Sequence, residues 1–239
     1  LIVALLESHE SQLSNGAKIS VRGHRHADLW TIFPNVKRVG IQVSGGADSA
    51  LLLYTLVKCI NEADIYVITG SLNTENNFNE QYAKDVVQEV IRLTDTKNIK
   101  DHIFKRQRKR GEHAGTDPNV IYRKSMLHNV AKKYNLDLML NGVTMNPPKG
   151  ILDEGRDKRR DKPMPLKIED EWLLVPVFRP FAQNDKRTIM KQYKKLDIMS
   201  LFEKTWSCEG TIESTQNFTV PCGECWWCKE RQWAMEEVV

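Results

Sequence analysis

This chain lacks a long apolar run. No stretch approaches the roughly 20 apolar residues that a membrane-spanning helix needs. The opening residues 1–6 are apolar, but Glu7 follows at once. Neither a basic leader nor a small-residue cleavage site is present, so we expect no secretory leader. No internal repeat is visible. These absences favour a cytoplasmic protein whose 239 residues form one large domain, or a domain with a small appendage.

A large excess of charge of one sign is also missing. The chain has 35 Lys and Arg against 31 Asp and Glu, a formal net charge of +4. Two basic runs, 105–110 and 156–162, could displace counterions from nucleic-acid phosphates. No recognised RNA-binding module accompanies them. We therefore predict solvated, mobile loops that close over a ligand, and keep nucleic-acid binding as the alternative.

Strand and helix patterns alternate from residue 36 onward. The expected strands are 36–43, 65–68, 99–104 and 136–140, and the expected helices are 49–60, 78–93 and 120–134. Such alternation predicts an α/β fold, a twisted parallel sheet with helices on both faces and right-handed connections. Beyond residue 145 we expect a loop at 146–150, a strand at 172–177 and a helix at 185–196.

The pattern divides the chain into three parts. We predict an N-terminal extension at 1–37, an α/β domain at 38–200 and a four-cysteine segment at 201–239. His24 and His26 in the extension could bind a metal, but no acidic or cysteine partner lies nearby. A polar surface loop is the expected reading of that stretch.

The sharpest local signal is the loop Ser44-Gly45-Gly46-Ala47-Asp48-Ser49, between an expected strand and an expected helix. Its glycines let the backbone approach a ligand closely, and free N–H groups at a helix start bind anions. The serines add hydroxyl donors, whereas Asp48 could bind Mg²⁺ or cap the helix. The P-loop pattern, with its lysine at the helix start, and the dinucleotide pattern Gly-x-Gly-x-x-Gly do not occur.

This loop resembles the signature of the PP-loop ATP pyrophosphatases. That family includes GMP synthetase, asparagine synthetase, argininosuccinate synthetase, several tRNA-modifying enzymes and 7-cyano-7-deazaguanine synthase. The resemblance implies an adenine nucleotide alpha hydrolase-like, Rossmann-like fold in which residues 44–49 hold the β- and γ-phosphates of ATP. A substrate oxygen then attacks the α-phosphate and pyrophosphate leaves. Mg²⁺ and cationic side chains would stabilise the charge that develops.

Four of the five cysteines are clustered near the C-terminus. Cys208 is followed by thirteen residues and then by Cys222-x-x-Cys225-x-x-Cys228. Four thiolates can close a tetrahedral structural Zn²⁺ site, which we expect here. An iron–sulfur cluster is the alternative, although the Cys-Pro continuation of ferredoxins is missing. A disulfide scaffold is not expected in a long, charged chain.

The tail narrows the resemblance. Residues 205–210, Thr-Trp-Ser-Cys-Glu-Gly, the three later cysteines and Arg231 are similar to the tail of the 7-cyano-7-deazaguanine synthase family. The resemblance spans about 38–235. It implies catalytic roles for Lys186 and Arg123 in addition to Asp48, and a nucleotide-binding role for Gly142. The chain departs from the family at 71–75 and 143–148, where the substrate should lie.

The resemblance implies an ATP-dependent C–N ligase of queuosine biosynthesis. In that family a 7-deazaguanine carboxylate is adenylated, and ammonia converts it through an amide to a nitrile. Relatives are often dimers, so a homodimer is expected. The alternatives are a tRNA-modifying PP-loop enzyme such as a sulfur transferase, a similar ligase for another acid, and a nucleotide-binding module without turnover.

Overall fold

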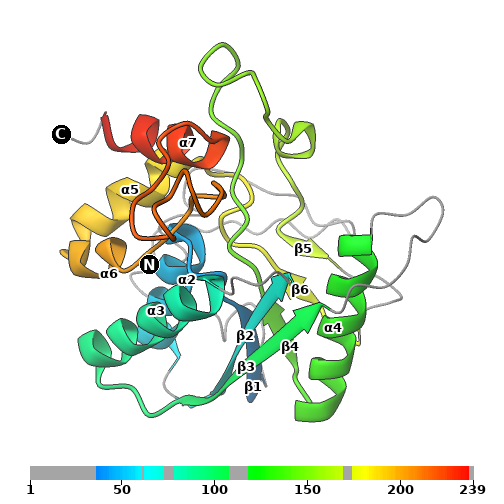
Figure 1. Ribbon diagram of the computed structural model, residues 1–239. Coiled ribbons are helices and arrows are strands. Elements are labelled where there is room, and N and C mark those ends of the chain that lie inside the picture. The colour runs from blue at the N-terminus through cyan, green and yellow to red at the C-terminus, as the bar shows by residue number, and fades with distance from the viewer. Residues whose placement is uncertain (1–35, 61, 73–77, 108–117, 169–173, 237–239) are drawn as a thin grey trace, which may run out of the picture.

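The computed structural model describes residues 36–60, 62–72, 78–107, 118–168 and 174–236. Through this part of the chain runs a six-stranded sheet with the order β3-β2-β1-β4-β6-β5 (Figure 1). The strands are β1 Arg38–Gln42, β2 Asp64–Leu72, β3 Ile99–Gln107, β4 Leu138–Leu140, β5 Lys167–Ile168 and β6 Val177–Phe178. Neighbouring strands are parallel except for β5, which runs antiparallel to β6.

Helices cover both faces of the sheet. They are α2 Ala47–Cys59, α3 Phe78–Thr94, α4 Pro118–Tyr134, α5 Lys186–Lys195, α6 Met199–Glu203 and α7 Trp226–Glu236. Figure 1 shows α4 on one side of the strands and α2, α3, α5 and α6 on the other. None of the helices in the described ranges is both long and apolar enough to span a membrane.

The strand side chains explain the two layers. Successive residues of a strand point to opposite faces. In β2, Val67 joins the core with α2 and α3, whereas Ile68 packs with Met126 and Val130 of α4. The two faces are therefore both apolar, as a parallel sheet between helices requires. This confirms the predicted α/β fold.

The topology places a binding position at the centre of the sheet. From β1 the chain proceeds outward to β2 and β3, and then crosses to β4 on the other side of β1. In open α/β sheets, ligands bind outside the carboxyl ends of the strands at such a switch point. Gly142 and Thr144, which follow β4, there contact Asp48 in the segment that follows β1.

Two sequence-based expectations were wrong. The strand expected at 172–177 is absent from 174–176, and β6 begins only at Val177. Pro176 has no N–H to donate to a ladder, although its carbonyl accepts from Met139 N–H at 3.0 Å. The run at 156–162 is not uniformly solvated, because it holds the 3-10 turn Lys158–Arg160 and the Arg160 side chain is buried.

Several expectations fall outside the described residues. They include residues 1–35 of the extension, with His24 and His26, and residues 108–110 of the first basic run. Residues 172–173 of the expected strand also lie there.

Candidate functional site

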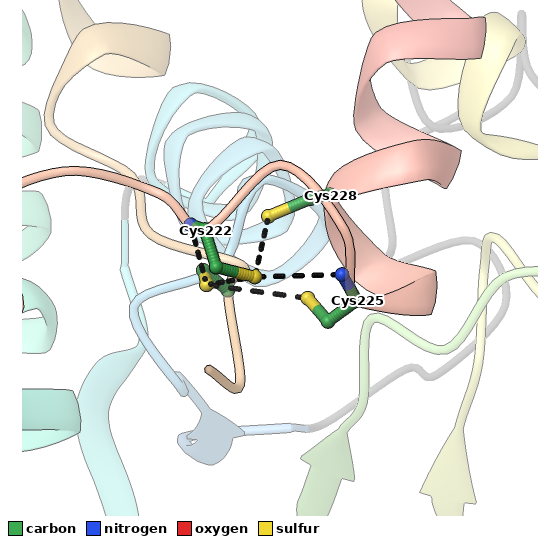
Figure 2. Close-up of side chains that lie close together, drawn as sticks. Cys222, Cys225 and Cys228 are labelled. Atoms are coloured by element: carbon green, nitrogen blue, oxygen red, sulfur yellow. Dashed lines mark hydrogen bonds between the residues drawn. The ribbon is translucent and has the colours of Figure 1, made fainter. Parts of the chain in front are cut away.

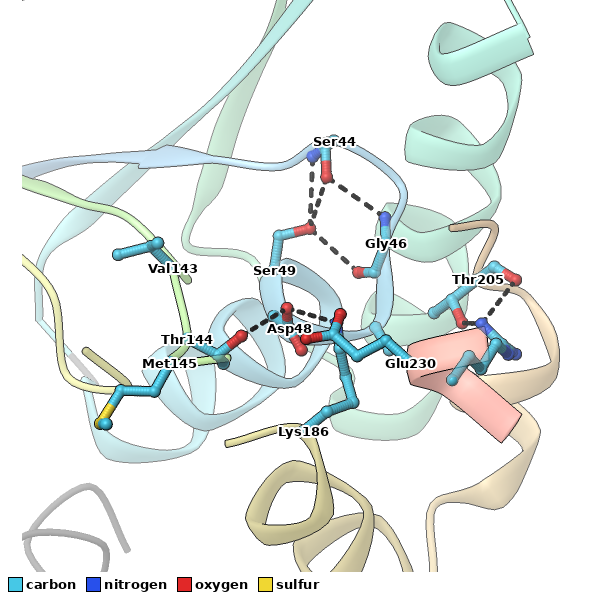
Figure 3. A network of polar contacts seen from close by, with 12 residues as sticks. Ser44, Gly46, Asp48, Ser49, Val143, Thr144, Met145, Lys186, Thr205 and Glu230 are labelled. Carbon is cyan, nitrogen blue, oxygen red and sulfur yellow. Dashed lines mark hydrogen bonds and ion pairs between the residues drawn. The ribbon is translucent and has the colours of Figure 1, made fainter. Parts of the chain in front are cut away.

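The loop after β1 is shaped by its own hydroxyl groups (Figure 3). Ser49 Oγ accepts from Ser44 N–H at 3.2 Å and donates to the Gly46 carbonyl at 3.0 Å. Ser44 Oγ accepts from Gly46 N–H at 3.3 Å. These contacts close the turn before α2 begins at Ala47. The start of α2 therefore lies at the switch point, and the N–H groups of a helix start are a position where an anion can bind.

Gly45 is required by both conformation and space. Its φ of 86° lies in the left-handed region, and an added Cβ would come within 2.8 Å of Tyr82 Cβ in α3. On its other side, Trp206 N–H donates to the Gly45 carbonyl at 2.8 Å. The Trp206 ring stacks on Tyr82 with centroids 4.8 Å apart. The loop is thus fixed between α3 and the segment that leads into the cysteines.

Gly142 lies against the start of α2. A Cβ at this position would come within 3.1 Å of the Asp48 carbonyl and of Ser49 N. That distance is shorter than a relaxed contact between a carbon atom and the backbone. Any larger residue would push the chain after β4 away from the start of α2 by a few tenths of an ångström. Its nucleotide-binding role remains a prediction.

Lys186 and Asp48 form the charged centre of the site. Asp185 caps α5 by accepting from Thr188 N–H, which fixes the next residue at the start of the helix. Lys186 Nζ then reaches Asp48 Oδ2 at 2.6 Å, and the lysine is only 5% exposed. Lys186 is therefore not a solvated surface lysine of the helix. Asp48 does not cap α2, whose N-cap is Gly46 and has no side-chain hydrogen bond.

Asp48 keeps one acceptor free among the described residues. Thr144 Oγ1 donates to Oδ2 at 3.4 Å, but Oδ1 is buried and has no hydrogen-bond partner in that part of the chain. A buried carboxylate oxygen is costly to leave unpaired. Hard oxygen ligands of this kind suit Mg²⁺, so this atom fits the cation that the sequence predicts.

The four clustered cysteines converge as a ligand set would. Their sulfur atoms all lie within 4.8 Å of one another. Cys208 and Cys222 are 3.4 Å apart, and Cys225 is 4.0 Å from Cys208 (Figure 2). A tetrahedral site with metal–sulfur bonds of about 2.3 Å places sulfurs about 3.8 Å apart. The donor set and spacing therefore fit a four-thiolate metal site.

Backbone N–H groups support thiolates in this cluster. Gly210 N–H and Cys222 N–H both donate to Cys208 Sγ at 3.3 Å. A hydrogen bond from Cys225 N–H, with smaller contributions, lowers the pKa of Cys222 to about 7. Burial raises the pKa of Cys228 well above its usual range, which a bound cation would reverse. Burial also raises the pKa of Cys208, so a bound cation would be needed to keep the two buried cysteines as thiolates.

The amino-acid sequence is similar to sequences of known proteins. A family model described as queuosine biosynthesis protein QueC matches residues 164–239. The 7-cyano-7-deazaguanine synthase of Sulfurihydrogenibium sp. is 26% identical over 219 residues, covering 82% of this chain and 93% of that protein. The chain is therefore similar to a 7-cyano-7-deazaguanine synthase over most of its length. This confirms the resemblance to PP-loop ATP pyrophosphatases and the prediction of an ATP-dependent C–N ligase.

Two solved structures are similar to this chain at a low level. NMN synthetase from Francisella tularensis has a TM-score of 0.46 and 13% identity, covering 87% of each chain. The U34-tRNA thiolase NcsA from Methanococcus maripaludis, solved with its 4Fe-4S cluster, has a TM-score of 0.43 and 13% identity. It covers 84% of this chain and 72% of its own. Both scores lie below 0.5, so these likenesses carry no inference about the site.

The QueC family match includes Lys186 and the four cysteines, but not the phosphate loop. Arg123 lies outside it as well. This arginine is in α4, on the face of the sheet opposite α2, and its side chain is outside the described residues. Its catalytic role stays a prediction.

Two functional candidates were missed from the sequence, Arg160 and Glu230. Arg160 Nη2 donates to Glu230 Oε1 at 2.9 Å, and Lys186 Nζ lies 3.6 Å from Glu230 Oε2. Both residues sit in strongly charged stretches, where a solvated surface is the usual expectation. Arg231, which the tail resemblance includes, instead donates to Thr205 Oγ1 at 2.8 Å and joins α7 to the segment after α6.

His102 supports the backbone just before the phosphate loop. Thr69 Oγ1 donates to the Val43 carbonyl at 2.7 Å and lies 2.8 Å from His102 Nε2. Since the hydroxyl proton is committed to Val43, the neutral histidine donates from Nε2. Burial, with a smaller effect of Lys84, lowers the pKa of His102 to about 4.

This histidine predicts an acid-sensitive stability. Its folded-state pKa lies below the unfolded value of about 6.5, so the unfolded chain binds the extra proton first as pH falls. The free energy of unfolding should therefore decrease between pH 6.5 and 4, by about 2 kcal/mol after allowing for partial exposure. Urea unfolding across this range should give a flatter profile for His102→Gln. Equal slopes for variant and wild type would contradict the assignment.

Proposed function

We propose that this chain adenylates a 7-deazaguanine carboxylate with ATP and, with ammonia, converts it to the amide and then the nitrile. The observation that carries the proposal is the Asp48–Lys186 pair, which lies beside an anion-binding loop at the switch point of the sheet. The homology to 7-cyano-7-deazaguanine synthases supplies the substrate class. The substrates are then a small acid, ATP and ammonia.

The loop residues Ser44, Gly45, Gly46 and Ser49 would receive the β- and γ-phosphates through backbone N–H and hydroxyl groups. A substrate carboxylate oxygen attacks the α-phosphorus, and the bond to the β-phosphate oxygen breaks. Lys186 lies close enough to the loop to offset the charge that grows on the leaving pyrophosphate. Its burial strengthens that interaction, because water screens it little.

The acyl adenylate then reacts with ammonia. The nitrogen forms a bond to the acyl carbon, AMP leaves with the former carboxylate oxygen, and a proton is lost to give the amide. Converting the amide to a nitrile removes its remaining oxygen, so the same activation of an oxygen by ATP is needed again. One activating site thus serves both halves of the conversion.

Asp48 Oδ1 would hold Mg²⁺, and the four cysteines would hold Zn²⁺. Bound Mg²⁺ supplies positive charge at the phosphates. The cysteines offer a four-thiolate set that leaves no open position for chemistry, so we assign it a structural role. That role is to fix Trp206, and with it the Gly45 carbonyl, beside the phosphate loop.

The proposal is tested by pyrophosphate release from ATP and Mg²⁺ with 7-carboxy-7-deazaguanine and ammonium, with mass spectrometry of the deazaguanine. We expect release with formation of amide or nitrile, and loss of both in Asp48→Asn. Release only with another acid, or only with tRNA, would keep the ATP chemistry and reject the deazaguanine substrate. Nucleotide binding without release under any of these conditions would reject the enzyme assignment.

A further inference from the structure

A buried chain of alternating charges connects four separate segments. Asp48 of α2 pairs with Lys186 of α5, Lys186 approaches Glu230 of α7, and Glu230 pairs with Arg160 of the 3-10 turn. Figure 3 shows Lys186, Asp48 and Glu230 meeting at the start of α2. These four residues are two carboxylates and two cations, so their charges balance.

Glu230 is the most deeply buried of these groups. Its side chain has no exposed surface, and desolvation raises its pKa despite the neighbouring Lys186 and Arg160. Ionised groups are rarely placed in such a position without a specific partner. Here the carboxylate is held from one side only, because Arg160 Nη2 donates to Oε1.

The second oxygen of Glu230 is left for Lys186. In the described part of the chain, Oε2 has no hydrogen-bond partner, and Lys186 Nζ lies 3.6 Å away. That distance is an ion-pair contact but too long for a hydrogen bond. The ammonium instead sits 2.6 Å from Asp48. Lys186 therefore lies between two carboxylates, bonded to one and within about 1 Å of bonding the other.

Arg160 fixes the position of Glu230. Its Nε donates to the Thr144 carbonyl at 2.7 Å, and its Nη2 donates to Thr144 Oγ1 at 3.0 Å. The guanidinium also lies over the Trp226 and Trp227 rings, at 5.2 and 5.3 Å from their centroids. These contacts hold Arg160 in place even if Lys186 moves, so the position of Glu230 is fixed as well.

We propose that Glu230 is a positioning residue that holds the Lys186 ammonium at the phosphate loop when Asp48 is engaged by a ligand. This inference rests on the proposed function, in which Asp48 and Lys186 serve the same triphosphate. Once Asp48 shares its charge with a cation, Lys186 loses its present partner. A second carboxylate in reach keeps the buried ammonium compensated and aimed at the loop.

A chemical test of this anchor needs no substrate. Lys186 is labelled by reductive methylation with formaldehyde, and its rate is followed by mass spectrometry in Asp48→Asn and in Asp48→Asn/Glu230→Gln. We expect Lys186 to stay protected in the single variant and to react about tenfold faster in the double variant. Equal labelling rates of Lys186 in the two variants would overturn the proposal. Because labelling needs no turnover, this result does not depend on the outcome for the proposed function.

The kinetic test separates positioning from fold support. In pyrophosphate release, Glu230→Gln should lower kcat about 10- to 100-fold and change KM for ATP less than about threefold. The loss should vanish in a Lys186→Gln background, since Glu230 acts through that lysine. Glu236→Gln, an exposed change on the same helix, is the matched control. If Glu230 acted only through its negative charge, its removal would favour the charge that grows on pyrophosphate and would raise kcat. An unchanged or faster rate would therefore overturn the proposal.

Discussion

Replacing Lys186 by Gln is expected to reduce pyrophosphate release by about 10³-fold while leaving the protein folded. The lysine is the cation that the structure places next to the loop at residues 44–49, through its 2.6 Å contact with Asp48. Groups aimed at developing charge in a water-poor site typically contribute factors of 10² to 10³. Gln keeps most of the side-chain volume and can still donate to Asp48. The rate is measured under saturating ATP.

Lys191→Gln is the matched control for this change, because it alters an exposed lysine on the same helix. It should leave the rate within about twofold. Both variants remove the shared cation of Asp48 and Glu230, but Lys186→Ala is expected to be less stable than Lys186→Gln, since Ala also leaves a cavity and no donor to Asp48. A Lys186→Gln enzyme with near-normal turnover would show that the pyrophosphate charge is neutralised elsewhere.

Removing one cysteine of the cluster should have the other large effect. Cys222→Ser is expected to lose the bound metal and to unfold the loop between Cys208 and the start of α7. Structural zinc sites contribute roughly 10 kcal/mol to folding. The loop before α7 has only a small apolar cluster around Trp206, whereas Trp233 and Ala234 hold α7 in the main core. Metal analysis by mass spectrometry and thermal unfolding together measure the effect.

Cys59→Ser serves as the control, because Cys59 lies in α2, outside the cluster. It should leave metal content unchanged. The expected metal is zinc, at one ion per chain. Iron and acid-labile sulfide in the wild-type protein would show that the cysteines hold an iron–sulfur cluster instead of zinc. A redox role would then replace the structural one. Wild-type protein without metal, and with the same melting temperature as Cys222→Ser, would contradict the structural role altogether.

Features set by local spacing could be predicted from the sequence. The loop at 44–49 depends on neighbouring residues, so a strand, two glycines and two serines were enough to place it. The cysteines were equally legible, since Cys222, Cys225 and Cys228 follow at fixed intervals. The alternating strands and helices predicted a parallel sheet, because each apolar run was short and bounded by turns.

Features that depend on contacts between distant residues could not be predicted from the sequence. Lys186 and Asp48 are separated by 138 positions, so only the fold, or the family resemblance, could bring them together. Glu230 and Arg160 have the composition of a surface, and their burial follows from pairing across α7 and the 3-10 turn. Helix α7 was not predicted for the same reason, because Glu230 interrupts its apolar face between Cys228 and Trp233.

In the proposed reaction, a substrate carboxylate oxygen attacks the α-phosphate of ATP at the loop of residues 44–49. The most direct test uses 7-carboxy-7-deazaguanine labelled with ¹⁸O in its carboxylate, with ATP, Mg²⁺ and ammonium, and mass spectrometry of the nucleotide products. The prediction is AMP that carries one heavy oxygen, beside unlabelled pyrophosphate. ADP as the product, or AMP without the label, would contradict activation through an acyl adenylate.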